Sequence, residues 1–151
     1  MKPDVTTVLA AVSGLIVREV APALGDTYLS EQLQRSAALL GAAGEEFDRA
    51  AARRVQENQA MRRIFRQAAV LPADREDDLA TALAAAARGS DLEDLRVSRL
   101  DADNHRLRSL LIRLHAWAES EQTPAARDLL AVIWTELRES TERRILSMSR
   151  I

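Results

Sequence analysis

The apolar positions of this chain recur at the three- and four-residue spacing of amphipathic helices. No segment shows the alternation with a period of two that is typical of a half-buried strand, and β-branched residues are sparse. We therefore expect an all-α protein. The links between the predicted helices are short, which favours antiparallel neighbours, so the predicted fold is an antiparallel four- or five-helix bundle.

The boundaries of the helices follow from capping and stop residues. Thr123 followed by Pro124 is the most specific start signal, with threonine at the N-cap and proline at the first helical position. Ser90 and Glu93 have the spacing of a capping box, and Gly89 closes the helix before them. Together these residues predict helices over about 4–20, 26–70, 74–88, 90–119 and 124–148.

The second predicted helix leaves one question open. Gly41 and Gly44 interrupt it, so the stretch forms either one long helix or two. The chain has 151 residues and contains no repeat, low-complexity tract or linker, so we expect a single helical-bundle domain over 1–151. The apolar stripe of the second helix continues across both glycines, through Leu29, Leu33, Leu40, Phe47, Met61 and Phe65.

Several polar or ionisable side chains fall on the apolar stripes when the helices are projected at about 100° per residue. An unpaired buried charge is costly, so such groups must find partners or reach water. We predict that Arg54 pairs with Glu19 or Asp103, because a guanidinium holds a carboxylate with two parallel hydrogen bonds. The candidate ligand-binding set is Glu19, Arg54, Asn58, Asp103 and Arg144, with Asn104 at its border.

Two interpretations of these core-facing charges remain open. In the first, they form structural ion pairs that fix the register of the helices. In the second, they line a polar pocket where Arg54 or Arg144 receives a carboxylate or phosphate group of a small ligand. A kink at Gly44 or Asp101 would instead turn the side chains out to solvent.

The composition excludes most catalytic and metal chemistry. The chain has no cysteine, a single lysine and two histidines, and it lacks Gly-rich phosphate loops and nucleophile motifs. His105 and His115 point to different sides of one helix and therefore cannot chelate one ion. No Glu-x-x-His motif of a di-iron bundle occurs. We expect no metal site, no cofactor and no catalytic residues, and a non-catalytic protein rather than an enzyme.

The charge pattern gives little support for nucleic acid as a partner. The net charge is −2, and the stretch 49–67 carries six arginines against one glutamate. A solvated helix face explains this stretch, although a phosphorylated or acidic partner and nucleic acid remain alternatives.

The N-terminal apolar run 5–17 resembles the core of a secretory signal, but Asp4 precedes it and Arg18 and Glu19 follow it. The run is also shorter than a bilayer span. We expect a cytoplasmic protein that makes no membrane contact.

Trp117 and Trp134 project to the flanks of their apolar stripes. Partly exposed tryptophans are typical interface anchors, although packing at the edge of the core explains them equally well. Helix bundles of this size often self-associate through such a flank, so a homodimer is the expected oligomer.

The stretch VLAAVSGLIVREVAPAL, residues 8–24, resembles the opening of a small, uncharacterised, all-helical bacterial family. Its members begin with an apolar helix that ends in an acidic residue, a hydrophobe, any residue, proline, any residue and leucine, which here is Glu19 to Leu24. LQRSAALL, residues 33–40, continues the likeness but lacks the family's asparagine near Leu39. The family is often encoded beside aminoglycoside-phosphotransferase-like kinases and acyl-CoA dehydrogenases.

This resemblance implies a non-catalytic accessory or interaction protein that partners a kinase-like or acyl-CoA enzyme. The alternative function is a small anionic-ligand binder, or a weak enzyme, that uses the polar core set. The two hypotheses differ in their structural requirement, because a ligand binder needs a pocket of about 300 Å³ or more that reaches those side chains.

Overall fold

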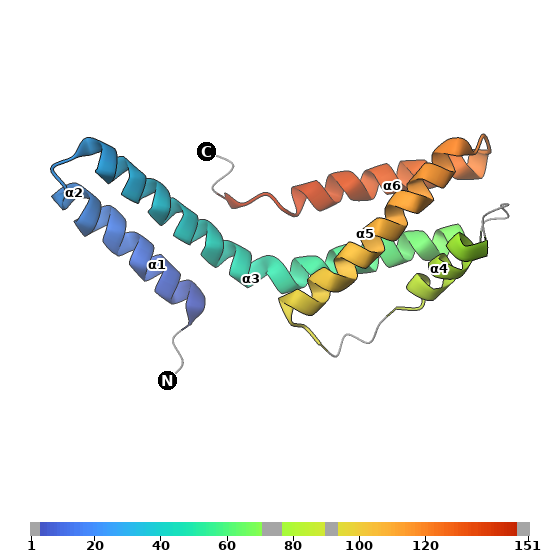
Figure 1. Cartoon of the computed structure of the whole chain (residues 1–151), viewed down its shortest axis with the longest axis horizontal. Coiled ribbons are helices and arrows are strands. Elements are labelled where there is room, and N and C mark those ends of the chain that lie inside the picture. The colour runs from blue at the N-terminus through green and yellow to red at the C-terminus, as the bar shows by residue number, and fades with distance from the viewer. Residues whose placement is uncertain (1–3, 71–76, 90–93, 148–151) are drawn as a thin grey trace. The chain divides into compact units, whose positions relative to one another are not determined.

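The computed structural model describes residues 4–70, 77–89 and 94–147, and every regular element in these ranges is a helix (Figure 1). The described ranges contain no strand, so the all-α prediction is confirmed. In chain order the elements are α1 (Val5–Leu15), the π-helix η1 (Ile16–Val20), α2 (Ala21–Ala23), α3 (Thr27–Ala69), α4 (Asp77–Ala87), α5 (Val97–Ser120) and α6 (Pro124–Glu142).

Helix α3 answers the question raised by Gly41 and Gly44, because it runs without interruption from Thr27 to Ala69. Gly44 is buried, and a Cβ atom built on it would lie 3.8 Å from the side chain of Leu9 in α1. Gly44 therefore lies at the contact between α1 and α3 and does not divide α3.

The chain forms two compact units, and α3 contributes to both. The first unit comprises residues 1–50 and 145–151, and the second comprises residues 51–144. The single-domain organisation expected from the sequence stays a prediction.

In the first unit, α1 lies beside the N-terminal part of α3 (Figure 1). The hydroxyl of Ser13 donates a hydrogen bond of 2.9 Å to the carbonyl of Ala37. The fully buried residues of this contact are small, Ala21 and Ala37 being 0% exposed. Small side chains permit a close approach of the two helices but bury little apolar surface.

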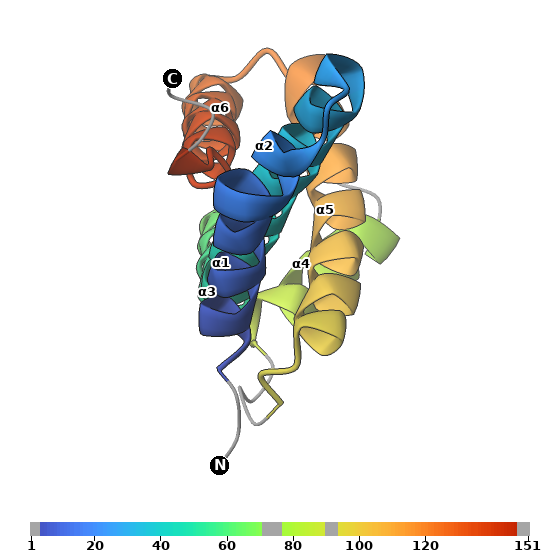
Figure 2. The ribbon, with the colours of Figure 1, turned by 90° about the vertical axis from the view of Figure 1, so that its left-hand side faces the viewer.

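The second unit contains the hydrophobic core, to which the C-terminal part of α3 and helices α4, α5 and α6 all contribute. Helix α5 packs against α4 and against α6, and Figure 2 shows these helices from a second side. The largest apolar side chains buried here are Phe65, Leu83, Leu107, Leu114, Leu129 and Ile133.

The predicted helix starts are confirmed only in part. Thr123 caps α6 as expected, since its hydroxyl accepts a hydrogen bond of 3.2 Å from the amide of Ala126, and Pro124 follows it. The predicted capping box at Ser90 and Glu93 lies outside the described residues. Helix α5 begins later than predicted, after Arg96, and α6 ends at Glu142 instead of near Met148.

The stretch Val5–Ala23 is long and apolar enough, by length and composition, to cross a membrane, and almost none of it is buried. This stretch is longer than the apolar run 5–17 because helical structure continues through η1 and α2. Core helices of soluble proteins and signal sequences satisfy the same criterion.

Candidate functional site

A buried carboxylate, that of Glu57 in α3, lies at the centre of a polar cluster in the core of the second unit. Its side chain is 1% exposed. Arg144 donates two hydrogen bonds of 2.9 Å to its two oxygens, one from Nε and one from a terminal nitrogen. Arg54 and Arg108 each approach Oε2 at 3.4 Å. One carboxylate thus pairs with three arginines, which come from α3, from α5 and from the residues just after α6.

The cluster continues from Glu57 through two asparagines. The amide nitrogen of Asn104 in α5 donates to Oε2 of Glu57 at 3.1 Å and to Oδ1 of Asn58 in α3 at 2.8 Å. Asn58 in turn donates to the carbonyl of Leu100 at 3.1 Å and to Asp103 at 3.4 Å. Asn58 and Asn104 are both buried, and their polar groups have partners, as buried amides require.

Asp103 forms the far end of this chain of hydrogen bonds. Its Oδ2 accepts a bond of 2.7 Å from Arg62, and its Oδ1 accepts a bond of 2.9 Å from Arg106. Arg62 also donates a 2.6 Å bond to the carbonyl of Ala86, at the end of α4. Polar contacts therefore connect α3, α4, α5 and the C-terminal end of α6 within the second unit.

The pKa values within the cluster differ in direction. Burial alone would raise the pKa of Glu57, but Arg144, through hydrogen bonds and charge, and the charges of Arg108 and Arg54 lower it to about 2. Glu136, on α6, shows the opposite behaviour, because burial raises its pKa and the charge of Arg143 offsets only part of this effect. The cluster therefore stabilises the anion of Glu57, whereas burial disfavours the anion of Glu136.

The structure brings four of the five predicted ligand-site residues into this cluster. Arg54 and Arg144 meet Glu57, and Asn58 meets Asp103. The predicted pairing of Arg54 is wrong, since its side chain pairs with Glu57 and Asp101, with the Nε atom donating to Asp101.

Glu19 does not belong to the cluster. It is exposed and lies in η1 of the first unit. Residues 16–20 are π-helical, so one extra residue is inserted in the turn, and Glu19 is rotated away from the stripe that the sequence projection gave it.

The sequence projection missed Glu57, Arg62 and Arg108. A signal for two of them was present, because Glu57 lies four residues before the buried Met61 and Arg62 lies four residues after Asn58. These spacings put both side chains on the buried side of α3. The predicted stripe used Phe47 and Leu29 as core positions, and both are exposed.

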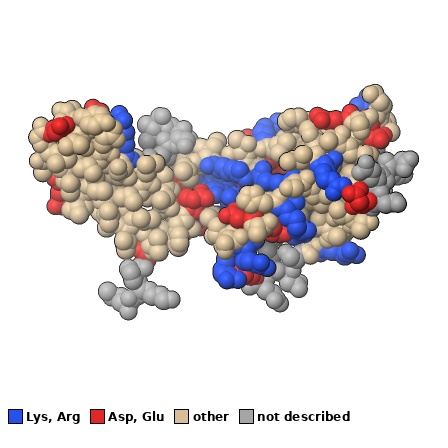
Figure 3. Space-filling model, in the orientation of Figure 1, with Lys and Arg blue, Asp and Glu red and all other residues tan. Residues whose placement is uncertain are grey.

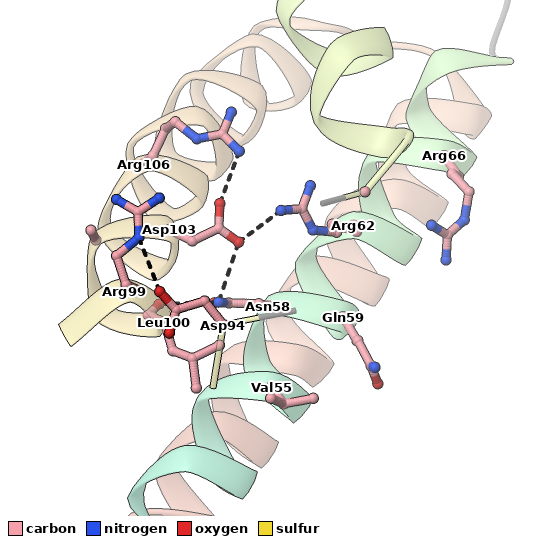
Figure 4. A pocket seen from close by; sticks show the side chains of 12 residues that line it. Val55, Asn58, Gln59, Arg62, Arg66, Asp94, Arg99, Leu100, Asp103 and Arg106 are labelled. Carbon is pink, nitrogen blue, oxygen red and sulfur yellow. Dashed lines mark hydrogen bonds and ion pairs between the residues drawn. The ribbon is translucent and has the colours of Figure 1, made fainter. Parts of the chain in front are cut away.

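A cleft of about 510 Å³ opens beside Asp103, between α3 and α5 (Figure 4). Arg62 and Arg66 line it from α3, and Arg99 and Arg106 line it from α5. Asn58, a predicted site residue, also lines it. The space next to Glu57 itself is far smaller, at about 10 Å³. The cleft therefore lies on the Asn58 and Asp103 side, whereas Arg54 and Arg144, the arginines that the pocket hypothesis relied on, do not line it and are engaged by carboxylates.

Trp117 and Trp134, the predicted interface residues, differ in their surroundings. Trp117 is half-buried and packs against the core. Trp134 is 58% exposed, and its ring meets that of His115 edge-on, with centroids 5.3 Å apart. Trp134 is thus available to a partner, whereas most of Trp117 is occupied by the fold.

A second feature is the apolar outer face of α1, in the first unit. Four of its large side chains are each 41–46% exposed, at the heptad spacing of a coiled-coil seam. In Figure 3 the surface of this unit is mostly tan, and most of the basic atoms on the face shown belong to the second unit. The exposed side chains, here called the α1 seam, are Val5, Val8, Val12 and Leu15.

The described residues contain no group of three or more histidine, cysteine, aspartate or glutamate side chains that could hold a metal ion. Comparisons of the chain with protein-family models, with curated proteins and with solved structures find no match.

Proposed function

We propose that the protein is a non-catalytic helical interaction protein that self-associates through the α1 seam. The observation that carries this proposal is the spacing of Val5, Val8, Val12 and Leu15, which alternates by three and four residues while all four side chains stay exposed. This pattern is the one with which two helices interlock their side chains. In the described chain the contacts of α1 with α3 are made by Leu9 and Ser13, which do not belong to the seam.

The partner best suited to the seam is a second copy of the chain. A two-fold dimer is self-complementary, so each contact between two seam residues of different copies occurs twice. The run 5–17 carries no charged residue, and seams that select a different partner usually use flanking charges for that purpose. Two copies of the α1–α3 hairpin would supply the four helices of an intermolecular bundle. The antiparallel four- or five-helix bundle expected within one chain stays a separate prediction.

A membrane is the alternative occupant of this apolar face. Against it, α1 lies along a stretch of α3 whose exposed side chains include Glu31 and Arg35. The stretch Val5–Ala23, which is long enough to span a bilayer, also contains Arg18 and Glu19, and charged side chains inside a bilayer are costly. A helix docked along such a polar neighbour is better suited to a protein partner than to lipid.

Substitution of one seam valine tests the proposal. Val12→Glu places a charge in the seam and, because the side chain is exposed in the single chain, should leave the helix content unchanged. Val17→Glu is the matched control, since Val17 is exposed to a similar degree but lies off the seam. By light scattering at about 100 µM, we expect twice the 16.7 kDa chain mass for the wild type and for V17E, and the chain mass for V12E.

Two results would contradict self-association through the α1 seam. One is a wild-type protein that stays monomeric at that concentration, and the other is identical behaviour of V12E and V17E. A third result would assign the seam to lipid instead. In that case the wild type would not self-associate but would bind phosphatidylcholine vesicles, and V12E would not bind them.

Two further expectations from the sequence remain proposals. An enzyme partner, implied by the resemblance in residues 8–24, would bind the assembled dimer. Trp134 would then be the natural contact for it, because this exposed tryptophan lies on α6, outside the seam. Capture of a kinase-like or acyl-CoA enzyme by the wild type and not by Trp134→Ser would support this assignment.

A further inference from the structure

The cleft between α3 and α5 is lined by more basic than acidic groups. Its lining includes four arginines, Arg62, Arg66, Arg99 and Arg106, and two aspartates. Asp103 is shared between Arg62 and Arg106. Asp94 is shared between Arg99, at 3.7 Å, and Arg96, which lies outside the lining. Among the described residues that line the cleft, positive charge therefore exceeds negative charge.

The arginines differ in how firmly they are held. The side chain of Arg62 is 8% exposed and is fixed by Asp103 and by the carbonyl of Ala86. Arg99 and Arg106, with 69% and 61% of their side chains exposed, lie at the open side. The cleft thus combines one buried, firmly held guanidinium, that of Arg62, with the exposed guanidiniums of Arg99 and Arg106, each of which pairs with one aspartate (Figure 4).

We propose that this cleft binds a small phosphorylated molecule. Its volume of about 510 Å³ lies in the range of small-ligand sites. A phosphate group carries up to two charges and several acceptor oxygens, so it satisfies guanidiniums that arrive from two helices at once. A carboxylate ligand would duplicate what Asp94 and Asp103 already supply.

The remaining lining fits the rest of such a ligand. Val55, Leu100 and Ala102 provide an apolar surface next to the arginines, where the carbon skeleton of a phosphorylated metabolite packs. Asn58 and Gln59 provide amide groups for hydroxyls. No aromatic side chain lines the cleft in the described residues, so it lacks the stacking surfaces by which proteins bind single-stranded nucleic acid.

Calorimetric titration at constant ionic strength tests the proposal, with inorganic phosphate, pyrophosphate and glucose 6-phosphate as probes. We expect the wild type to bind glucose 6-phosphate with a Kd of about 10 µM to 1 mM. The double variant R99Q/R106Q should weaken binding at least about tenfold, since both side chains are exposed and each supplies charge-assisted donors.

The matched control is R127Q/R138Q, which removes the same charge from two exposed arginines of α6 outside the cleft. It should bind within about twofold of the wild type. Equal loss in both double variants would overturn the proposal in favour of unspecific charge attraction, and so would no binding by the wild type at about 10 mM probe. Should R99Q/R106Q unfold, Arg66→Gln, an exposed lining residue, serves as the second variant.

The same titration carried out with other polyanions tests whether the ligand is a small molecule. Binding of single-stranded DNA, or of vesicles that contain a phosphoinositide, about tenfold tighter than glucose 6-phosphate would overturn the small-molecule assignment. The cleft residues all belong to the second unit, so V12E should bind the probes as the wild type does. Failure of self-association and failure of anion binding are thus distinguishable.

Discussion

Glu57 shows how a buried charge is kept in a helical core. Its carboxylate accepts hydrogen bonds from three arginines, from Asn104 and from Ser140. The arginines themselves reach solvent, since the side chain of Arg144 is 42% exposed and that of Arg108 is 32% exposed. The acid is therefore desolvated while its counter-charges remain partly hydrated, which limits the cost of the buried cluster.

Removal of this one charge should destabilise the protein. In Glu57→Gln the arginines lose their common acceptor, and we expect a loss of about 2 to 3 kcal/mol in the free energy of unfolding at neutral pH, measured with urea. Glu136→Gln is the matched control, because the pKa of Glu136 is raised by burial and its charge does not favour the folded state. E136Q should be neutral or slightly stabilising.

The loss of stability in E57Q should also change with pH, in a direction set by the pKa of Glu57. The pKa of Glu57 is lowered from 4.5 to about 2, which corresponds to about 3 kcal/mol of stability. A lowered pKa stabilises the fold at pH values above 4.5, and this contribution is lost as the pH falls toward about 2. The stability difference between wild type and E57Q should therefore shrink over that window. A difference that stays constant would show that the ionised form of Glu57 is not what the cluster stabilises.

Helical periodicity alone located much of this cluster but not its centre. Arg54, Asn58, Asp103 and Arg144 project onto apolar stripes in the sequence, and all four lie in the cluster. Glu57 was missed because the predicted stripe was drawn as one line through Phe47 and Met61. Helix α3 passes through two compact units, so its buried side is defined by different neighbours in each of them.

At the scale of the elements, local capping chemistry was the more reliable guide. The Thr123–Pro124 pair gave the start of α6 correctly because both residues act locally, Thr123 through its hydroxyl on the amide of Ala126 and Pro124 through its fixed backbone angle. The π-helical segment η1 had no such local marker. Its one-residue insertion moves Glu19 off the seam and puts Val20, which is 40% exposed, at the next seam position. Periodicity at a fixed 100° per residue cannot predict that shift.

The cap of α6 can be tested directly. Thr123→Ala removes the acceptor for the Ala126 amide, and we expect about 1 kcal/mol less stability. Thr123→Ser keeps the hydroxyl and should stay within a few tenths of a kcal/mol of the wild type. Urea unfolding followed by tryptophan fluorescence reports on this change, since both tryptophans lie in the second unit. Equal stability of all three proteins would mean that the amide is satisfied without the side chain.

At the scale of the whole molecule, the two compact units bury very different side chains. The second unit buries large apolar residues such as Phe65, Leu107 and Ile133. In the described part of the first unit, the buried residues are small, namely Ala21, Ala37, Gly44 and Ala50. Burial of alanine and glycine contributes little free energy, so the first unit gains much less from its internal packing. Burial of the exposed α1 seam against a second copy would supply apolar burial that the first unit lacks in its interior.

The weak internal packing of the first unit predicts how the hydrogen exchange of its amides should depend on protein concentration. If the seam pairs with a second copy, amides of α1 and of the N-terminal part of α3 should exchange more slowly as the concentration rises through the dimer Kd. Amides of α5 and α6 should keep the same protection, because their core is complete within one chain. In V12E the first unit should show the fast exchange of the dilute wild type at every concentration. Slow, concentration-independent exchange of α1 in the wild type would mean that the hairpin is stable by itself, and the seam would then have no role in holding it folded.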